Sequence, residues 1–265
     1  MSRRLRLDAE LVRRGLARSR DQAADLIAAG RVAVGGQTAA KAASQVSVDA
    51  AITLAQASDQ PDYVSRGGHK LAGALAAFGD LHLAGKRCLD AGASTGGFTD
   101  VLLRAGAAHV VAVDVGYGQL AWSLQTDSRV TVLDRVNIRT LTPDQVAPVP
   151  ELVVADLSFI SLTLVLPALV GCAAPDADFV LMVKPQFEVG RDLVGSGVVK
   201  DPELRFAAVS AVAAAAAGLK LGVAGVTASP LPGPSGNVEY FLWLRRGAPE
   251  LDADAVRQAI AAGPQ

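Results

Sequence analysis

The chain has 265 residues, of which 51% are hydrophobic, and it carries 25 basic and 26 acidic residues. This length and composition allow one large domain, or a large domain joined to a small one. The longest alanine-rich apolar stretch, residues 206–219, is shorter than the roughly 20 residues of a membrane span. No apolar segment of a secretory signal follows the charged first residues. We therefore expect a cytoplasmic protein with no membrane contact.

The two cysteines, Cys88 and Cys172, show neither metal-ligand spacing nor a pairing signature. Each falls in or beside an expected buried element. Small buried thiols of this kind are typical of a reducing compartment. We expect no structural disulfide and no metal site.

Charge is unevenly distributed along the chain. Residues 1–60 hold nine basic and six acidic residues, whereas residues 61–265 hold sixteen and twenty. Seven of the nine basic residues in the first segment lie before residue 21. Such asymmetry indicates a nucleic-acid-facing module at the N-terminus, followed by a larger acidic domain.

The first segment has the pattern of a compact α+β module. Leucines and a valine between Leu5 and Leu16 form a helical apolar stripe, and Ser19 is placed to cap a second helix over residues 20–29. Short strands are expected at 31–38, with a Gly35-Gly36 turn, and at 46–48 and 52–54. A linker is expected over residues 58–62. These limits predict a first domain over residues 1–60 and a second over 61–265.

This pattern of two basic helices followed by small strands is similar to the S4 RNA-binding domain. The resemblance implies that planar guanidinium groups on the helix pair contact RNA phosphates. The alternative is an ordinary solvated helix face. The expected RNA-binding residues are Arg3, Arg4, Arg6, Arg14, Arg18 and Arg20.

The second segment alternates apolar strands with helical stretches, which is typical of a doubly wound, Rossmann-like α/β sheet. Helices are expected at 97–105, 162–172 and 202–219. The expected strands are 87–90, 110–114, 130–133, 152–156, 179–183, 223–228 and 239–244. The last two form a closing pair that places an antiparallel strand in an otherwise parallel sheet, as in class I methyltransferases.

A glycine-containing loop, Asp90-Ala-Gly-Ala-Ser-Thr-Gly-Gly-Phe98, follows the first strand of this segment. Ligands of open α/β sheets bind at such carboxyl ends, where strand order reverses. Glycine lets the backbone turn tightly and approach a ligand. Asp114 ends the next strand, where an acid can accept hydrogen bonds from ribose hydroxyls.

The spacing of this loop favours S-adenosylmethionine over a dinucleotide. The glycines do not follow G-x-G-x-x-G, and the leading Asp90 suits an ammonium group better than a pyrophosphate. Asn137, after the third strand, is placed to reach the adenine edge. The expected cofactor-binding residues are Asp90, Gly92, Ala93, Ser94, Thr95, Gly96, Gly97, Phe98, Asp114, Val115 and Asn137.

Four charged residues stand where they can meet at the edge that holds this loop. Asp156 and Lys184 directly follow apolar strands, and Glu239 begins the final strand. Lys70 lies on the helix that enters the second domain. Each alone could be a rim charge, but together they form a candidate catalytic group.

Five segments closely resemble the TlyA-type (haemolysin A) ribosomal RNA cytidine 2′-O-methyltransferases, which join an S4-like domain to an FtsJ-like methyltransferase domain. The segments are Ser65-Arg-Gly-Gly-His-Lys70, Asp90–Phe98, Asp156-Leu-Ser-Phe-Ile-Ser161, Val183-Lys-Pro-Gln-Phe-Glu188 and Pro232-Gly-Pro-Ser-Gly-Asn-Val-Glu239. The resemblance implies a catalytic Lys-Asp-Lys-Glu tetrad formed by Lys70, Asp156, Lys184 and Glu239. It departs from the family at Pro61-Asp-Tyr63, where the family tends to have a basic residue and a tryptophan.

These residues suit methyl transfer to a ribose 2′-hydroxyl, which must lose its proton to become a good nucleophile. Lys184 is the candidate general base, and Lys70 is the second cation that favours its neutral form and stabilises alkoxide charge. Asp156 would orient the lysines, and Glu239 would hold a lysine or the ribose. The expected partner is ribosomal RNA or a ribosomal subunit, bound by a monomer.

Other classes remain open from the sequence alone. A nicotinamide oxidoreductase would share the fold, and an S4-linked pseudouridine synthase would share the first module. An S4-linked RNA-binding protein without transferase activity is another alternative. The haemolysin name adds a membrane-lytic protein, although the chain has no strongly amphipathic basic helix with large apolar residues.

Overall fold

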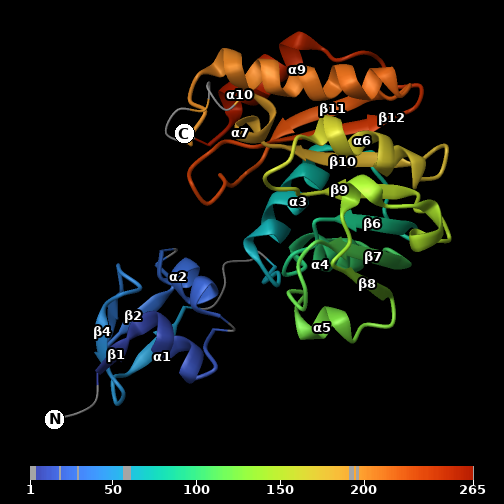
Figure 1. Ribbon diagram of the computed structural model, residues 1–265. Helices are drawn as coiled ribbons and strands as arrows, with labels where there is room; N and C mark the ends of the chain where they lie inside the picture. Colours follow the sequence, from blue (N-terminus) through green and yellow to red (C-terminus); the bar gives the residue numbers. More distant parts are fainter. Residues whose placement is uncertain are drawn as a thin grey trace. The chain divides into compact units, whose positions relative to one another are not determined.

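The computed structural model describes residues 4–17, 19–28, 30–55, 61–190, 194 and 197–264. The chain divides into two compact units, Met1–Asp62 and Tyr63–Gln265. Each unit has its own hydrophobic core. Figure 1 labels the helices and strands of both units, which are described separately below. No helix among these residues has the length and apolarity needed to cross a membrane.

The first unit contains two helices and two small sheets. One sheet pairs β1 with β4, and the other has the order β3-β2-β5, with every pairing antiparallel. Leu7, Leu11, Ile27 and Val32 are buried where the helices meet the strands. The elements are β1 (Arg4–Arg6), α1 (Leu7–Arg13), α2 (Arg20–Ala28), β2 (Val32–Val34), β3 (Gln37–Thr38), β4 (Gln45–Ser47) and β5 (Ile52–Leu54).

The start of this unit differs from the expectation drawn from its leucine spacing. The stripe predicted a helix that includes Leu5, but residues 4–6 form β1 and the helix begins at Leu7. Leu5 pairs with Val46 of β4. A two-stranded ladder therefore overrides the helical period in this segment, a tertiary effect that local spacing does not contain.

The second unit is built on a seven-stranded sheet with the order β11-β12-β10-β9-β6-β7-β8. All pairings are parallel except those of β12, which runs antiparallel to β10 and β11. The mostly parallel, doubly wound fold with one antiparallel strand is thus confirmed. The strands are β6 (Arg87–Ala91), β7 (His109–Asp114), β8 (Val130–Asp134), β9 (Leu152–Ala155), β10 (Asp178–Val183), β11 (Gly222–Ala228) and β12 (Tyr240–Arg245).

Helices cover both faces of this sheet. In Figure 1, α9 runs along the end formed by β11 and β12, and α5 lies at the β8 end. Two short 3₁₀ helices, η1 (Ile138–Thr140) and η2 (Pro143–Val146), follow β8. The α-helices are α3 (Arg66–Ala77), α4 (Gly97–Arg104), α5 (Trp122–Gln125), α6 (Leu162–Gly171), α7 (Pro185–Glu188), α9 (Pro202–Gly218) and α10 (Ala253–Ala262).

The central strands are buried on both faces, and their side chains alternate between two cores. In β9, Val153 belongs to the core under α6 and α9, whereas Val154 belongs to the core under α3 and α4. This two-sided burial explains why the strands read as continuous apolar runs. It also leaves the carboxyl edge of the sheet as the place where polar residues emerge.

Strand order reverses between β6 and β9, because β6 leads to β7 on one side while β9 leads to β10 on the other. The glycine loop follows β6, and Asp156 follows β9. Polar residues from both halves of the sheet therefore meet at the reversal point, which is where ligands of such sheets bind.

Candidate active site

Two ion pairs lie at the carboxyl edge of the sheet, one of them buried and the other partly exposed at Asp156. Lys70 Nζ lies 2.5 Å from Glu239 Oε2, and both side chains are almost fully buried. Lys184 Nζ lies 2.6 Å from Asp156 Oδ1 and also donates a hydrogen bond of 3.0 Å to Ser158 Oγ. The structure thus arranges the four expected catalytic residues as two lysine–carboxylate pairs. Buried charges of this kind are stable only when they are paired.

The register of β10 and β12 explains how two of these residues become neighbours. The last paired position joins Val183 to Tyr240. Continuing the antiparallel ladder by one step places Lys184 opposite Glu239. Lys184 directly follows β10 with an extended backbone, and Glu239 directly precedes β12. The charged residues therefore begin where the two apolar strands end. The sequence expected Glu239 inside the final strand, but it immediately precedes β12.

Small residues bring Lys70 to this edge by letting α3 pack closely. A Cβ on Gly97 would lie 2.4 Å from Ser65 Oγ, so the first turns of α3 and α4 touch. A Cβ on Gly68 would lie 2.5 Å from the Cβ of Tyr63. Tyr63 therefore fills the space that Gly68 leaves.

The glycines of the loop are explained by packing within the protein. Gly92 and Gly96 have positive φ angles of 85° and 96°. A Cβ on Gly92 would lie 2.6 Å from the carbonyl oxygen of Asp156, and one on Gly96 would lie 2.3 Å from Leu124 Cδ1. The space that a Cβ would fill at these glycines is therefore occupied by neighbouring chain segments, and their expected contact with a ligand stays a prediction.

Asp90 is a buried carboxyl group with one unused oxygen. Its Oδ2 accepts a 2.6 Å hydrogen bond from Thr99 Oγ1. Its Oδ1 is inaccessible to solvent and has no hydrogen-bond partner among the described residues. Burial raises the pKa of Asp90 to about 7. A buried acceptor without a donor is costly, so Oδ1 fits a cationic donor such as the ammonium group expected of the cofactor.

Asp114 organises the loop through its two carboxylate oxygens. Oδ2 accepts a hydrogen bond from the backbone N–H of Ser94 at 2.8 Å, and Oδ1 accepts one from Gly116 at 2.7 Å. Each carboxylate oxygen can accept more than one hydrogen bond. Asp114 therefore fixes the loop and keeps capacity for the ribose hydroxyls that the sequence assigned to it.

The remaining expected cofactor residues divide into two groups. Ala93 and Phe98 are buried in the core under α3 and α4, and the ring centroid of Phe98 lies 6.0 Å from that of Phe241. The side chain of Phe98 is thus a core element, and its expected contact with the cofactor stays a prediction. Thr95, Val115 and Asn137 are exposed, and Asn137 Oδ1 accepts a hydrogen bond from the N–H of Arg139.

Phe159 lies beside the Asp156–Lys184 pair, and sequence reasoning gave it no role. Its side chain is 92% exposed, and its φ of 64° places a bulky residue in the left-handed region. Its ring centroid lies 5.3 Å from that of Phe187, whose ring centroid lies 6.0 Å from Lys184 Nζ. An exposed aromatic ring on strained backbone indicates a functional surface.

Glu188 is a second residue that the sequence reasoning left without a role. Its carboxylate accepts hydrogen bonds from Ser161 Oγ at 2.5 Å and from the N–H of Leu162 at 2.8 Å. It therefore caps α6 from α7, and joins the loop after β9 to the loop after β10. Burial raises the pKa of Glu188.

In the first unit, the expected RNA-binding arginines differ in their contacts and in their exposure to solvent. Arg6 and Arg20 both bind Asp8 at 2.9 Å, and more than two-fifths of each side chain stays exposed. Arg4 is exposed. The Arg6 guanidinium, with Arg20, holds the pKa of Asp8 well below its usual range. Arg3 and Arg18 lie outside the described residues.

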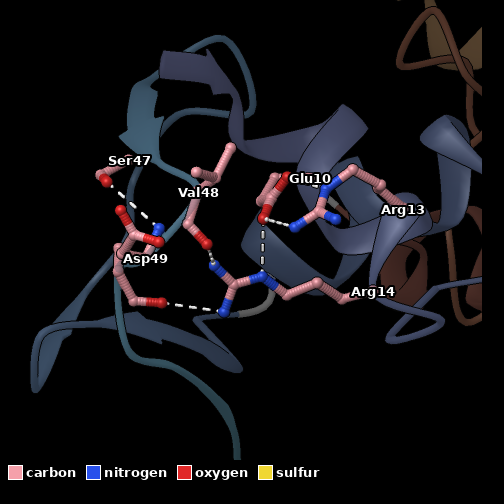
Figure 2. Close-up of polar contacts among 7 residues, drawn as sticks. Glu10, Arg13, Arg14, Ser47, Val48 and Asp49 are labelled. Carbon is pink, nitrogen blue, oxygen red and sulfur yellow. Dashed lines mark hydrogen bonds and ion pairs between the residues drawn. The ribbon is translucent and has the colours of Figure 1, made fainter. Parts of the chain in front are cut away.

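Arg14 differs because its donors are used inside the unit. It donates to Glu10 Oε1 and to the carbonyl oxygens of Ala50 and Val48, at 2.7–2.8 Å (Figure 2). Only 23% of its side chain is exposed. Hydrogen bonds from Arg13 and Arg14 lower the pKa of the buried Glu10 to about 2. Arg14 thus ties α1 to the segment after β4, rather than presenting a free guanidinium to RNA.

Among the residues that the structure describes, no group of three or more histidine, cysteine or acidic side chains could hold a metal ion. Cys88 and Cys172 are free and buried. Burial raises the pKa of the Cys88 thiol to about 12. Neither thiol is therefore an active nucleophile at neutral pH.

Comparison with known proteins identifies both units. Residues 63–246 match the FtsJ-like methyltransferase family model, and residues 5–52 match the S4 domain model. A 16S/23S rRNA (cytidine-2′-O)-methyltransferase, TlyA of Mycobacterium tuberculosis, is 62% identical over 271 residues and covers 100% of both chains. A Bacillus subtilis protein described as a candidate rRNA methyltransferase is 42% identical, covering 92% of this chain and 86% of its own.

A solved structure from Streptococcus thermophilus, described as a candidate hemolysin, has the same architecture. Its TM-score is 0.78 at 36% identity, and the alignment covers 98% of this chain and 96% of that one. The family models cover both units, and the relatives are similar over nearly the whole chain. The chain therefore belongs to the TlyA family of FtsJ-like methyltransferases that carry an S4 domain.

Proposed function

We propose that this chain transfers a methyl group from S-adenosylmethionine to the ribose 2′-hydroxyl of a cytidine in 16S rRNA, 23S rRNA or both. The observation that carries the proposal is the pair of lysine–carboxylate contacts, Lys70–Glu239 and Lys184–Asp156, beside the glycine loop. The substrate class is that of the 62% identical relative from M. tuberculosis. We place the reaction in the cytoplasm and assign it to a monomer.

The residues at the reversal point suit S-adenosylmethionine. Asp90 Oδ1 would accept from the ammonium group, and Asp114 would accept from the ribose hydroxyls. Exposed Asn137 and Val115 flank the place proposed for the adenine. When bound, the cofactor supplies an electrophilic methyl group on a sulfonium centre.

Within the tetrad, Lys184 is the proposed general base. Lys184 acts after its ammonium group has released a proton: the neutral Nζ takes the proton of the 2′-hydroxyl as the oxygen attacks the methyl group, and Asp156 then holds the ammonium group that forms again. Lys70, held by Glu239, supplies the positive charge that stabilises the developing alkoxide. Positioned proton transfer is typically worth 10²- to 10⁴-fold in rate.

Phe159 is the proposed platform for the base of the target nucleotide. A base that is read as a single nucleotide leaves its stack and is commonly held against an aromatic ring. The exposed ring of Phe159, next to Phe187 and the Asp156–Lys184 pair, provides such a surface. The S4 unit adds phosphate contacts through Arg4, Arg6 and Arg20.

The proposal is tested by incubating the protein with labelled S-adenosylmethionine and either ribosomal subunits or free rRNA. We expect label in RNA, and none when Lys184 or Lys70 is replaced by Ala. Two further measurements test the alternative classes of protein. Calorimetry with S-adenosylmethionine and NAD tests for a nicotinamide oxidoreductase, and leakage from liposomes tests for a membrane-lytic protein. NAD binding without S-adenosylmethionine binding, or leakage without methyl transfer, would contradict the proposal.

A further inference from the structure

A pocket lies near the carboxyl edge of the sheet and is not used by the chemistry described above. It has a volume of about 600 Å³, within the range of ligand-binding cavities. Its walls come from the segment before α9, from α9 itself, from the loop before β12 and from the last turns of α10. The residues that matter below are Lys200, Glu203, Arg205, Phe206, Val238 and Arg257.

The topology places this pocket at the same edge as the tetrad. Tyr240 pairs with Val183 at the carboxyl end of β10 and with Ala228 at the end of β11, so the loop before it lies beyond that edge. Val238 lines the pocket, and the next residue, Glu239, binds Lys70. The end of α10 also reaches this loop, because a Cβ on Gly263 would lie 2.9 Å from Val238 Cγ1.

The wall of the pocket is fixed by a buried amide. Asn237 Oδ1 accepts from the N–H of Val199 at 2.9 Å, and its Nδ2 donates to the carbonyl oxygen of Gly197 at 2.8 Å. Arg205 Nε also donates to the carbonyl oxygen of Val199 at 2.9 Å. Asn237 is only 2% exposed. The segments on either side of the pocket are therefore joined before any ligand arrives.

Positive charge dominates the lining. Lys200, Arg205 and Arg257 face one carboxylate, Glu203. The Arg257 guanidinium carbon lies 4.5 Å from the ring centroid of Phe206, which holds the planar cation against an aromatic face. Within the described part of the chain, neither Lys200 nor Arg257 has a carboxylate within ion-pair distance. Free cations beside an aromatic and aliphatic wall suit a phosphodiester with an attached base.

We propose that this pocket binds a nucleotide of the substrate RNA strand that flanks the methylated one, with Lys200 and Arg257 on its phosphate. The inference rests on the proposed function and deepens it. Val238 of this loop faces the pocket and the adjacent Glu239 faces Lys70 on the other face of the sheet, so the proposed strand passes from its ribose at Lys184 across the loop to the pocket. An acidic protein segment is the competing occupant.

The test compares two double variants that remove the same charge. Lys200→Gln with Arg257→Gln changes the pocket, and Lys220→Gln with Arg246→Gln changes the opposite edge of the sheet. Filter binding to ribosomal subunits and rRNA is measured from low to moderate salt. Each lost phosphate contact lowers the salt slope by about 1, so the pocket variant should lose about 2, whereas the control loses none. Binding of S-adenosylmethionine should stay unchanged in both double variants.

A single variant that removes a negative charge from the pocket strengthens the test. Glu203→Gln removes the one carboxylate of the lining, and it should tighten RNA binding and raise the salt slope. Equal salt slopes of RNA binding for the two double variants, or an unchanged RNA affinity of Glu203→Gln, would overturn the inference. Either result would leave an acidic protein segment as the competing occupant of the pocket. Binding is measured without turnover, so failure of the wild-type protein to methylate RNA would refute the proposed function separately.

Discussion

Lys70 Nζ and Glu239 Oε2 lie 2.5 Å apart although 169 residues separate them in the chain. The contact joins the helix that enters the methyltransferase unit to the loop that precedes its last strand. Both side chains are buried. Removing one partner would leave an unpaired buried charge, which typically costs 3–5 kcal/mol.

Glu239→Gln and Lys70→Met each remove one charge of this pair and keep a side chain of similar size. We expect each variant to lose methyl transfer by at least about 100-fold, while binding of S-adenosylmethionine in calorimetry changes little. The double variant removes both charges together and should be more stable to urea than either single variant. Retained activity in the double variant would contradict the role given to Lys70.

Asp90 predicts how stability depends on pH. Its pKa is raised from an ordinary 3.8 to about 7 by burial, so the folded protein binds this proton more tightly than the unfolded chain. Its contribution to the free energy of unfolding is therefore complete below about pH 4 and is lost as the pH rises towards about 7. Asp90→Asn should flatten this part of the curve.

Urea unfolding of wild type and Asp90→Asn between pH 4 and pH 8 measures that difference. Binding of an ammonium ligand should also release a proton near neutral pH, because it favours the ionised carboxylate. Calorimetry in buffers of different ionisation enthalpy detects this proton. Parallel stability curves for the two proteins would show that the Asp90 carboxyl is not the group concerned.

Substitutions of Phe159 should affect stability and RNA binding differently. Phe159→Ala removes the ring but keeps a Cβ at a φ of 64°, whereas Phe159→Gly also relieves the left-handed strain. We expect Phe159→Gly to be more stable than Phe159→Ala by about 1–2 kcal/mol, and both to raise the KM for RNA equally. Phe159→Trp should retain activity. Wild-type kinetics in the alanine variant would exclude a stacking role.

The arginines of the S4 unit should show two distinct phenotypes. Arg14→Ala leaves the buried Glu10 with Arg13 as its side-chain donor and removes the guanidinium donors of the Ala50 and Val48 carbonyl groups, so we expect it to destabilise that unit by about 2–4 kcal/mol. Arg6→Ala and Arg20→Ala should instead weaken RNA binding and lower its salt slope by about 1 each. Thermal unfolding and filter binding of the three variants distinguish these outcomes. Arg14→Ala protein with normal stability but weakened RNA binding would reverse the assignment.

Glu188 should act on catalysis through the loop it holds. Glu188→Gln keeps an acceptor for Ser161 or Leu162, whereas Glu188→Ala removes both contacts. We expect the alanine variant to lower kcat more than it raises KM, and the glutamine variant to recover most of that loss. The wild-type pH–rate profile should fall at low pH as Glu188 protonates, and Glu188→Gln should lack that step. Identical profiles would limit Glu188 to a structural role.

The fold was predictable because its central strands are buried on both faces and so form continuous apolar runs. The reversal point could be found from the glycine loop after β6, and Lys184 and Asp156, the proposed catalytic pair, from charges placed directly after strands. The sequence placed Lys70 and Glu239 at the same edge of the sheet, but no local pattern shows that Lys70 pairs with Glu239. Leu5 shows the limit of periodicity, because its strand exists only when β4 is present.

The same reasoning explains the residues that were missed or assigned differently. Arg14 donates to two carbonyl groups of the segment after β4, whereas Arg6 stays partly exposed. Sequence spacing does not contain this difference, because it depends on where the segment after β4 lies. Phe98 occupies a ligand-binding motif but packs against Phe241 from a distant strand. The left-handed backbone of Phe159 follows from the packing of its loop, and a phenylalanine gives no local signal for that conformation.

The most direct test of the proposed reaction is the chemical position of the transferred methyl group. Ribosomal subunits methylated in vitro are subjected to partial alkaline hydrolysis, which requires a free 2′-hydroxyl at each cleaved nucleotide. We predict a single protected position at a cytidine for each modified rRNA, absent with Lys184→Ala. Label that resides on a base, with an unbroken alkaline ladder, would contradict ribose 2′-O-methylation and with it the role of the tetrad.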